Sequence, residues 1–245
     1  MNGKNQKINK IQKNIKIINT NMKRIFAFFA VAAAMIAAEN SYAQLSIRAG
    51  YAPETWKTSY TATSTGITDT SSANLNGLFV GAHYNFGLTG DLKMSVGVQY
   101  RYNFHKETGS GNFFGVMGAN FEGKSTQSVI DVPVLVNYGL DLTEAMRLSI
   151  FAGSTLNLAL AGKTKYTITI DALGKSAVEE GEYKWYGDSP LTYSRLNLSA
   201  TFGLNLTYMH FGIFGGYNMG LLDIDVDKDN KVTTKGYFVG LGYTF

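Results

Sequence analysis

Apolar and polar residues alternate along most of the chain after residue 43, with a period of two. The clearest segment runs from Lys93 to His105. Its apolar positions are Met94, Val96, Val98, Tyr100, Tyr102 and Phe104. The positions between them are small or polar, a pattern typical of a β-strand with an apolar environment on one side only. The chain after residue 43 has no uncharged apolar run of about 18 residues, so no helical membrane span is predicted.

Seven further segments share this pattern, so the sequence predicts eight strands. They are Gln44–Tyr51, Asn76–Gly87, Lys93–His105, Ser128–Gly139, Arg147–Leu158, Arg195–Tyr208, His210–Leu221 and Lys235–Phe245. Short connections at 88–92, 140–146 and Met209 alternate with long polar ones at 52–75, 106–127, 159–194 and 222–234. Short turns on one rim and long loops on the other are typical of membrane-spanning barrels. The predicted fold is all-β, an eight-stranded antiparallel transmembrane up-and-down barrel with short periplasmic turns and long extracellular loops.

Charged residues decide which face of this barrel points inward. The polar face carries Arg48, His83, Arg101, Asp131, Arg147 and Arg195. A water-soluble barrel of the lipocalin type keeps apolar residues inside. Charges in such a core would be very costly, whereas in a polar lumen they can pair. We therefore predict that these six residues form an ion-pair network in the lumen and that the apolar face contacts lipid.

Aromatic residues are expected both inside the barrel and at its two edges. An eight-stranded barrel is just wide enough for side chains to fill, so inward Phe79, Phe151, Phe214 and Phe238 should plug the space beside glycines and leave no wide pore. Two interfacial girdles are predicted on the outside. The periplasmic girdle would contain Tyr84, Phe86, Tyr138, Tyr208, Phe211, Tyr243 and Phe245, and the other girdle Tyr51, Tyr100, Tyr102 and Phe104.

The first 43 residues have the pattern of an export signal. Met22-Lys23-Arg24 precedes an uncharged apolar run, residues 25–38, and a small-x-small site ends at Ala43. This arrangement predicts a secretory signal peptide cleaved near Ala43/Gln44, because the run is shorter than the ~20 residues of a good transmembrane helix. Residues 1–21 show no packing pattern, so either translation begins at Met22 or the basic region is unusually long. The two expected domains are residues 1–43, removed on export, and residues 44–245, the barrel.

Removal of the leader changes the charge of the chain. Residues 1–43 hold seven of the 22 Lys and Arg residues and one of the 18 acidic residues, which leaves 15 basic and 17 acidic residues. A net charge of −2 gives no support for nucleic-acid binding. The chain has no Cys, which excludes disulfides, thiolate metal sites and lipoprotein attachment. The three His are too scattered for a metal site, and no cofactor is predicted.

One strand resembles a known family. Residues 130–138 read Ile-Asp-Val-Pro-Val-Leu-Val-Asn-Tyr, which resembles the acidic-aliphatic-Pro-aliphatic-Leu-aliphatic-Lys-Tyr strand of PorT-like outer-membrane β-barrel proteins. Asp131 stands where Glu is usual and Asn137 where Lys is usual; Phe151-Ala152-Gly153 and the last strand extend the resemblance. The resemblance implies an eight-stranded barrel in a Gram-negative outer membrane, with no defined catalytic residues. The terminal Tyr243 and Phe245 resemble the ending that implies recognition by the barrel-assembly machinery.

Function follows from these features only in outline. We expect a non-enzymatic outer-membrane barrel that contacts membrane lipid and lipopolysaccharide. Its loops would serve envelope structure, adhesion or contact with an extracellular or envelope partner, and Trp56 and Trp185 in those loops could dock a partner or rest on lipid headgroups. One alternative is a lipid A-modifying enzyme that uses His105 and Ser110, since a nucleophile needs a base within hydrogen-bond reach. A weaker alternative is a narrow channel through the Arg-lined lumen.

Overall fold

The computed structural model describes residues 44–61, 68–113, 117–172, 175–187, 193–226 and 230–245. Residues 1–43, with the predicted signal peptide, form a separate unit and lie outside the described residues. The described part forms one antiparallel sheet of ten strands. The strands are β1 (Gln44–Tyr51), β2 (Glu54–Thr61), β3 (Thr68–Thr89), β4 (Leu92–Phe113), β5 (Met117–Thr143), β6 (Met146–Ala172), β7 (Lys175–Lys184), β8 (Leu196–Tyr208), β9 (Phe211–Gly220) and β10 (Asn230–Thr244).

The sheet closes on itself as a barrel with eight strand positions in its wall; β1 with β2, and β7 with β8, share one position each. β1 and β2 both pair with β3, the strands from β3 to β6 pair in chain order, β6 pairs with β8 and β8 with β9, and β10 closes the ring by pairing with β9 and with β1 and β2. A break at Ala52 and Pro53 divides the first strand position into β1 and β2. β7 and β8 pair with successive parts of the same strand, β6. The all-β barrel predicted from the sequence is therefore confirmed. Closure satisfies the backbone hydrogen bonds of the strands within the barrel wall, which a membrane-spanning sheet requires.

The two faces of the barrel wall differ as predicted. Outward side chains are apolar and exposed, among them Val98 (55%), Ile150 (56%), Leu204 (55%) and Leu241 (65%). Inward side chains of the same strands are polar or aromatic and buried, such as Arg101 and Phe151. This polarity is the opposite of that of a water-soluble barrel and matches a surface in contact with hydrocarbon.

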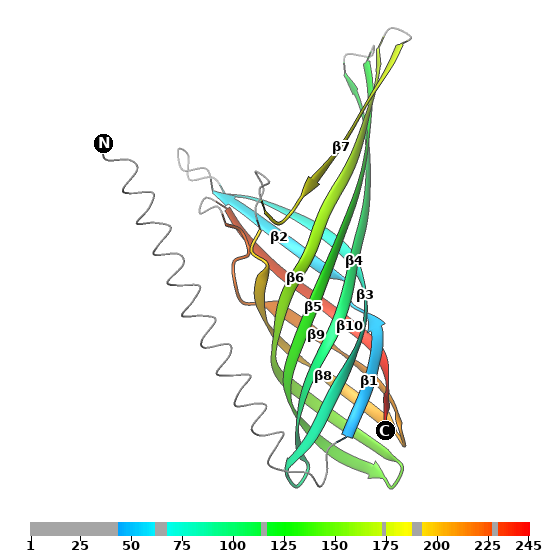
Figure 1. Cartoon of the computed structure of the whole chain (residues 1–245), viewed down its shortest axis with the longest axis vertical. Coiled ribbons are helices and arrows are strands. Elements are labelled where there is room, and N and C mark those ends of the chain that lie inside the picture. The colour runs from blue at the N-terminus through cyan, green and yellow to red at the C-terminus, as the bar shows by residue number, and fades with distance from the viewer. Residues whose placement is uncertain (1–43, 62–67, 114–116, 173–174, 188–192, 227–229) are drawn as a thin grey trace, which may run out of the picture. The chain divides into compact units, whose positions relative to one another are not determined.

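Most of the segments predicted as loops are strands. The register pairs His105 of β4 with Ser125 of β5, Thr164 of β6 and, through β6, Tyr183 of β7, and pairing continues beyond this row to the strand ends. We call the part beyond and including this row, residues 105–113, 117–125, 164–172 and 175–183, the projecting sheet; it rises above the barrel in Figure 1. The prediction of loops over 106–127 and 159–194 is thus wrong for most of their length, and β2 and the first part of β3 occupy most of 52–75. These strands escaped prediction because their outward side chains are no longer apolar once they leave the bilayer.

The barrel wall divides where the projecting sheet begins. Pairing between β3 and β4 starts at Asn76 and Phe104, so the earlier residues of β3 pair only with β2. In Figure 1, β2 and this part of β3 lean away from β7. The projecting sheet therefore has two free edges, formed by β4 and β7.

A bulge in β6 marks the same boundary. Val129 pairs with Ala159, but the preceding Ser128 pairs with Ala161, so Leu160 is an extra residue. One extra residue exchanges the two faces of a strand. Odd-numbered residues of β6 point inward below Leu160, and even-numbered ones do so above it. This exchange explains why the alternation in the sequence ends at Leu158.

The other rim consists of tight turns. Met209, between β8 and β9, has a φ of 53°, a left-handed conformation that is uncommon for a residue with a side chain. Gln44 and Phe245 lie at this rim, and the Phe245 amide donates to the Leu45 carbonyl at 2.9 Å. No helix within the described residues is long and apolar enough to cross a membrane.

Candidate functional site

A buried ionic triad lies at the centre of the barrel interior. Arg101 of β4 donates through Nε to Asp131 Oδ2 of β5 at 2.8 Å and through Nη1 to Glu54 of β2. Asn157 Nδ2 donates to Asp131 Oδ1 at 2.7 Å, and Ser199 donates to Asn157 at 2.7 Å. One cation between two carboxylates is stabilised by excellent geometry and by further hydrogen bonds, the conditions under which a buried ion pair is tolerated. The triad joins β2, β4 and β5 across the lumen, and Asn157 and Ser199 extend the network to β6 and β8.

The structure brings together only two of the six predicted lumen residues, Arg101 and Asp131. Glu54, the second carboxylate, lies in a segment predicted as a loop and was missed. His83 is buried, and its ring is held by Gln99 Nε2, at 2.8 Å from Nε2, and by Ser95 Oγ, at 3.2 Å from Nδ1. Because the Gln99 amide donates to Nε2, that nitrogen carries no proton and His83 is a neutral hydrogen-bond partner rather than part of an ion pair.

The three remaining arginines lie apart from the triad. Arg48 lies over the Phe214 ring at 5.1 Å and forms no ion pair within the described part of the chain. Arg147 lies at the short-turn rim, where it pairs with Asp141 at 2.7 Å and Asp91 at 3.0 Å. Arg195 is exposed and donates to the carbonyl of Leu160 at 2.6 Å, so it binds the bulge in β6. These arginines share the polar face but lie at different heights, which the alternation alone does not show.

A layer of four phenylalanines fills the interior next to the triad. The centroid of Phe214 lies 6.1 Å from that of Phe79 and 6.3 Å from that of Phe238, and Phe151 stacks on Phe238 at 6.1 Å. Each ring covers a glycine on a neighbouring strand, where a Cβ would come within 2.5–2.8 Å of the ring. The pairs are Phe79 with Gly50, Phe151 with Gly203, Phe214 with Gly240 and Phe238 with Gly216. The predicted inward placement of these phenylalanines is confirmed.

An aromatic plug closes the end of the interior that lies next to the projecting sheet. Trp56 and Trp185 are buried, with ring centroids 5.2 Å apart, and Tyr193 packs edge-on against Trp56 at 5.3 Å. Both indole N–H groups are bonded, to Glu54 at 2.7 Å and to Thr164 at 2.9 Å. The other members of the plug are Leu75, Ala159, Tyr186, Ile224 and Val232. The tryptophans, predicted to be exposed in loops, are therefore buried in a small core.

These layers leave little free volume in the interior. The cavity beside the phenylalanine layer has a volume of about 30 Å³, and those around the triad and below the plug have about 10 and 30 Å³. A cavity needs roughly 10–15 Å³ to hold one water molecule. The described interior thus has room for isolated waters and not for a hydrated ion path. Wider pockets lie outside this filled part: one of about 320 Å³ at the short-turn rim, beside Arg48 and Lys93, and one of about 420 Å³ on the projecting sheet, beside Phe121.

The two residues of the proposed enzyme site do not meet. His105 and Ser110 lie on one continuous strand, β4, five positions apart. At about 3.3 Å per residue they are about 16 Å apart, and they point to opposite faces. A base and its nucleophile must lie within hydrogen-bond reach. This arrangement provides no catalytic pair, and within the described residues no group of three or more His, Cys, Asp and Glu side chains is placed to hold a metal ion.

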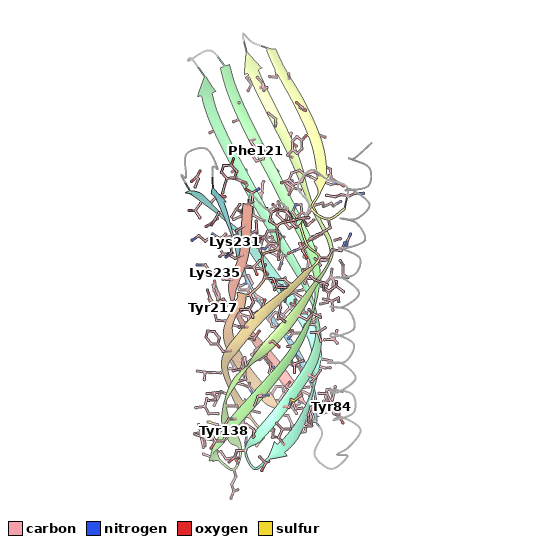
Figure 2. The ribbon with its side chains drawn as sticks, turned by 90° about the vertical axis from the view of Figure 1, so that its left-hand side faces the viewer. Tyr84, Phe121, Tyr138, Tyr217, Lys231 and Lys235 are labelled. Atoms are coloured by element: carbon pink, nitrogen blue, oxygen red, sulfur yellow. The ribbon has the colours of Figure 1, made fainter. Side chains whose placement is uncertain are left out.

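The face of the projecting sheet that continues the lumen side is uncovered; its central strands β5 and β6 carry apolar side chains, and its edge strands carry Glu107 and Glu179. Phe121 of β5 is 37% exposed and Ile170 of β6 is 40% exposed. The cross-strand register places Phe121 beside Ile168, and Tyr166, two residues before Ile168, lies on the same face. Figure 2 shows Phe121 on this sheet, far from Tyr84 and Tyr138 at the opposite end of the barrel. These apolar side chains are accessible and lie beyond the lipid-facing band.

Both predicted girdles are present. Tyr102 and Phe104 stack at 6.3 Å on the outside of β4, and Tyr51 contacts Tyr237 at 6.5 Å. At the short-turn end the exposed members are Tyr138, Tyr208, Phe211, Tyr243 and Phe245. Phe86 differs from the prediction, since it is buried at 5% exposure beside Tyr84, directly before an irregularity in the strand. The two girdles delimit the band of the barrel that lies in the bilayer.

The chain is similar to several solved outer-membrane proteins. No curated protein matches the chain. Among solved structures, it is similar to the attachment invasion locus protein Ail of Yersinia pestis, with 17% identity, 82% of this chain and 98% of that chain covered, and a TM-score of 0.30. Neisserial surface protein A gives 15% identity, 84% and 100% coverage and a TM-score of 0.36. The outer membrane protease OmpT of Escherichia coli gives 10% identity, 84% and 97% coverage and a TM-score of 0.34.

A family model described as "Outer membrane protein beta-barrel domain" matches residues 37–226. This range includes the triad, the projecting sheet and every strand except the closing strand β10, and it exceeds half of the chain. The protein therefore belongs to the outer membrane β-barrel domain family and is located in the outer membrane.

Proposed function

We propose that the protein is a non-enzymatic surface barrel that holds the projecting sheet outside the cell for contact with a protein partner. The observation that carries the proposal is the combination of a filled interior with an uncovered apolar face on the projecting sheet. A barrel filled by a triad, a phenylalanine layer and a plug is suited to be a rigid mount. An exposed apolar face on a water-surrounded element marks an interaction site.

The proposed orientation follows the rule for outer-membrane barrels. Short turns face the periplasm and long connections face the outside. The rim with Gln44, Phe245 and the tight turns is then periplasmic, and the projecting sheet is extracellular. At about 3.4 Å per residue the strands of the sheet extend roughly 30 Å beyond the upper girdle, which places Phe121 clear of the membrane.

Photo-crosslinking in intact cells tests the contact. We expect a benzoylphenylalanine at position 121 to give a discrete protein adduct, because this side chain lies on the apolar face. The matched control is position 120, one residue away on the opposite face of the same strand, which should give none. Equal adducts at both positions, or none at 121 in a barrel that still shows a heat-dependent shift in electrophoretic mobility, would contradict the proposed contact face.

We also propose the finer assignments that the sequence predicts. Export would remove residues 1–43 by cleavage near Ala43/Gln44. The PorT-like strand forms the middle of β5, where Asp131 and Pro133 point into the lumen. Tyr243 and Phe245, with ring centroids 5.0 Å apart at the end of the closing strand, would be read by the barrel-assembly machinery. The mass of the mature protein tests the first assignment, since an N-terminus other than Gln44 contradicts it.

A further inference from the structure

Five lysines line the outward face of the strands where the projecting sheet leaves the barrel. Lys106 of β4 lies directly opposite Lys124 of β5, which lies opposite Lys165 of β6. The adjacent row on this face contains Lys163 of β6 opposite Lys184 of β7. We call these five residues the lysine rows.

The lysine rows are an unfavourable arrangement for an isolated sheet. Neighbouring strands are about 4.8 Å apart, and like charges directly opposite each other are destabilising. Two carboxylates offset part of the charge. Glu122 lies 3.3 Å from Lys106 and 2.9 Å from Lys124, and Glu182 lies 3.2 Å from Lys163 and 3.8 Å from Lys165. Five ammonium groups against these two carboxylates leave an excess of three positive charges; the next acidic residue on this face is Glu180, which lies in the row of Glu122, opposite Thr167.

The ion pairs keep the lysine side chains close together but leave a net positive charge on the lysine rows. The hydrogen bonds from Lys124 and Lys106 lower the pKa of the Glu122 carboxyl, so this carboxylate is ionised at neutral pH. Each carboxylate lies within ion-pair distance of two lysines on the same face. The ammonium groups are thus gathered within reach of one another, as binding of a multiply charged anion requires.

Their height on the barrel matches that of lipid headgroups. Phe104 precedes Lys106 by two residues on the same face of β4, and it belongs to the aromatic girdle. Three more outward lysines, Lys57, Lys231 and Lys235, lie at the corresponding height on β2 and β10; Figure 2 shows Lys231 and Lys235 beyond Tyr217. Of the lysine side chains that the structure describes, only Lys93 lies at the short-turn end, where it faces the pocket beside Arg48. Outward positive charge is therefore confined to one edge of the bilayer.

We propose that the lysine rows bind the phosphate groups of lipid A in the outer leaflet. The inference rests on the proposed orientation of the barrel, with the projecting sheet outside. Lipid A carries phosphates directly above its acyl chains, and the barrel presents apolar residues, then aromatic rings, then ammonium groups in the same order. Lysine is a strong point-charge partner for phosphate. Bound phosphates would also remove the repulsion between the opposed lysines.

Native mass spectrometry of the full-length protein in detergent tests the proposal. The probes are bis-phosphorylated lipid A, the same lipid after dephosphorylation, and phosphatidylglycerol. The variant replaces Lys106, Lys124 and Lys165 by Gln, and we expect it to bind bis-phosphorylated lipid A about 100-fold more weakly, since each ammonium near an anionic lipid contributes roughly a factor of five. The Lys93→Gln control should bind like the unmodified protein, and Arg at all three positions should retain binding.

A second measurement separates binding from folding. Without lipid A, the Gln variant should keep the heat-dependent mobility shift and unfold at the same or a higher temperature, because the repulsion is gone. The proposal is overturned by equal affinity of the Gln variant for lipid A, by equal affinity of the protein for all three lipids, or by a lower unfolding temperature of the variant, which would make the rows structural. The crosslink at position 121 involves the opposite face, so its loss or retention reports on the partner contact alone.

Discussion

At the scale of single residues, the interior of this barrel depends on one buried cation. Arg101 of β4 satisfies one carboxylate from the neighbouring strand β5 and one from β2, and Asn157 completes the coordination of Asp131. A buried charge that loses its partner is much more costly than the removal of the whole group. Removal of one member of the triad should therefore lower the free energy of unfolding much more than replacement of all three members together.

We predict that Asp131→Ala lowers the free energy of unfolding in detergent by about 3–5 kcal/mol, because Arg101 is left with one partner in a dry interior. The matched control replaces the triad as a unit, with Glu54→Gln, Arg101→Met and Asp131→Leu together, and should lose far less. Urea titration of the refolded proteins gives both values. A loss for the triple variant as large as that of Asp131→Ala would show that volume rather than charge governs this layer.

At the scale of elements, the sequence shows those strands that touch lipid and hides those that do not. The alternation in β5 is visible from Ser128 because Ile130 and the following outward residues are apolar, and it fades toward Glu122, where the outward residues become polar. In β6 it ends at Leu158 for a second reason, since the bulge at Leu160 exchanges the faces. The aromatic plug was not predictable, because Trp56 and Trp185 meet through a contact between residues distant in sequence, and no local pattern encodes it.

The plug gives a prediction at this scale. Trp56→Ala should lower the free energy of unfolding by about 3–5 kcal/mol, as expected for an aromatic core residue. Trp185 is the other tryptophan of the chain, so its fluorescence in the variant should shift to longer wavelength and become accessible to iodide. The control Tyr60→Ala, at an exposed site on the same strand, should change stability by no more than about 0.5 kcal/mol. Unchanged iodide quenching of Trp185 would place the tryptophans outside a common core.

At the scale of the whole molecule, sequence and structure agree on a closed barrel with a lipid-facing exterior, because the charges and the alternation are global properties of the chain. The alternation does not predict the position of each arginine along the barrel axis. Arg48, Arg147 and Arg195 share one predicted face, yet each has its own partner: a ring, a pair of aspartates at a turn, and the backbone of a bulge. Only the register between strands separates these roles.

The filled interior predicts the electrical behaviour of the molecule. The full-length protein should show a heat-dependent shift in electrophoretic mobility and yet conduct no steady current in a planar bilayer, because the described cavities have room for isolated waters only. A stable single-channel current from heat-modifiable protein would revive the narrow-channel alternative. Soluble protein without a mobility shift would contradict the barrel itself.

The single additional residue at Leu160 also limits how the gene can change. A side-chain period of two means that any odd change in length inverts everything that follows it. Deletion of Leu160 would carry Lys163 and Lys165 toward the tryptophans and send Thr164 out to the lipid headgroups, while the part of β6 within the bilayer stayed as it was. Insertions and deletions near this position should therefore survive only in even numbers.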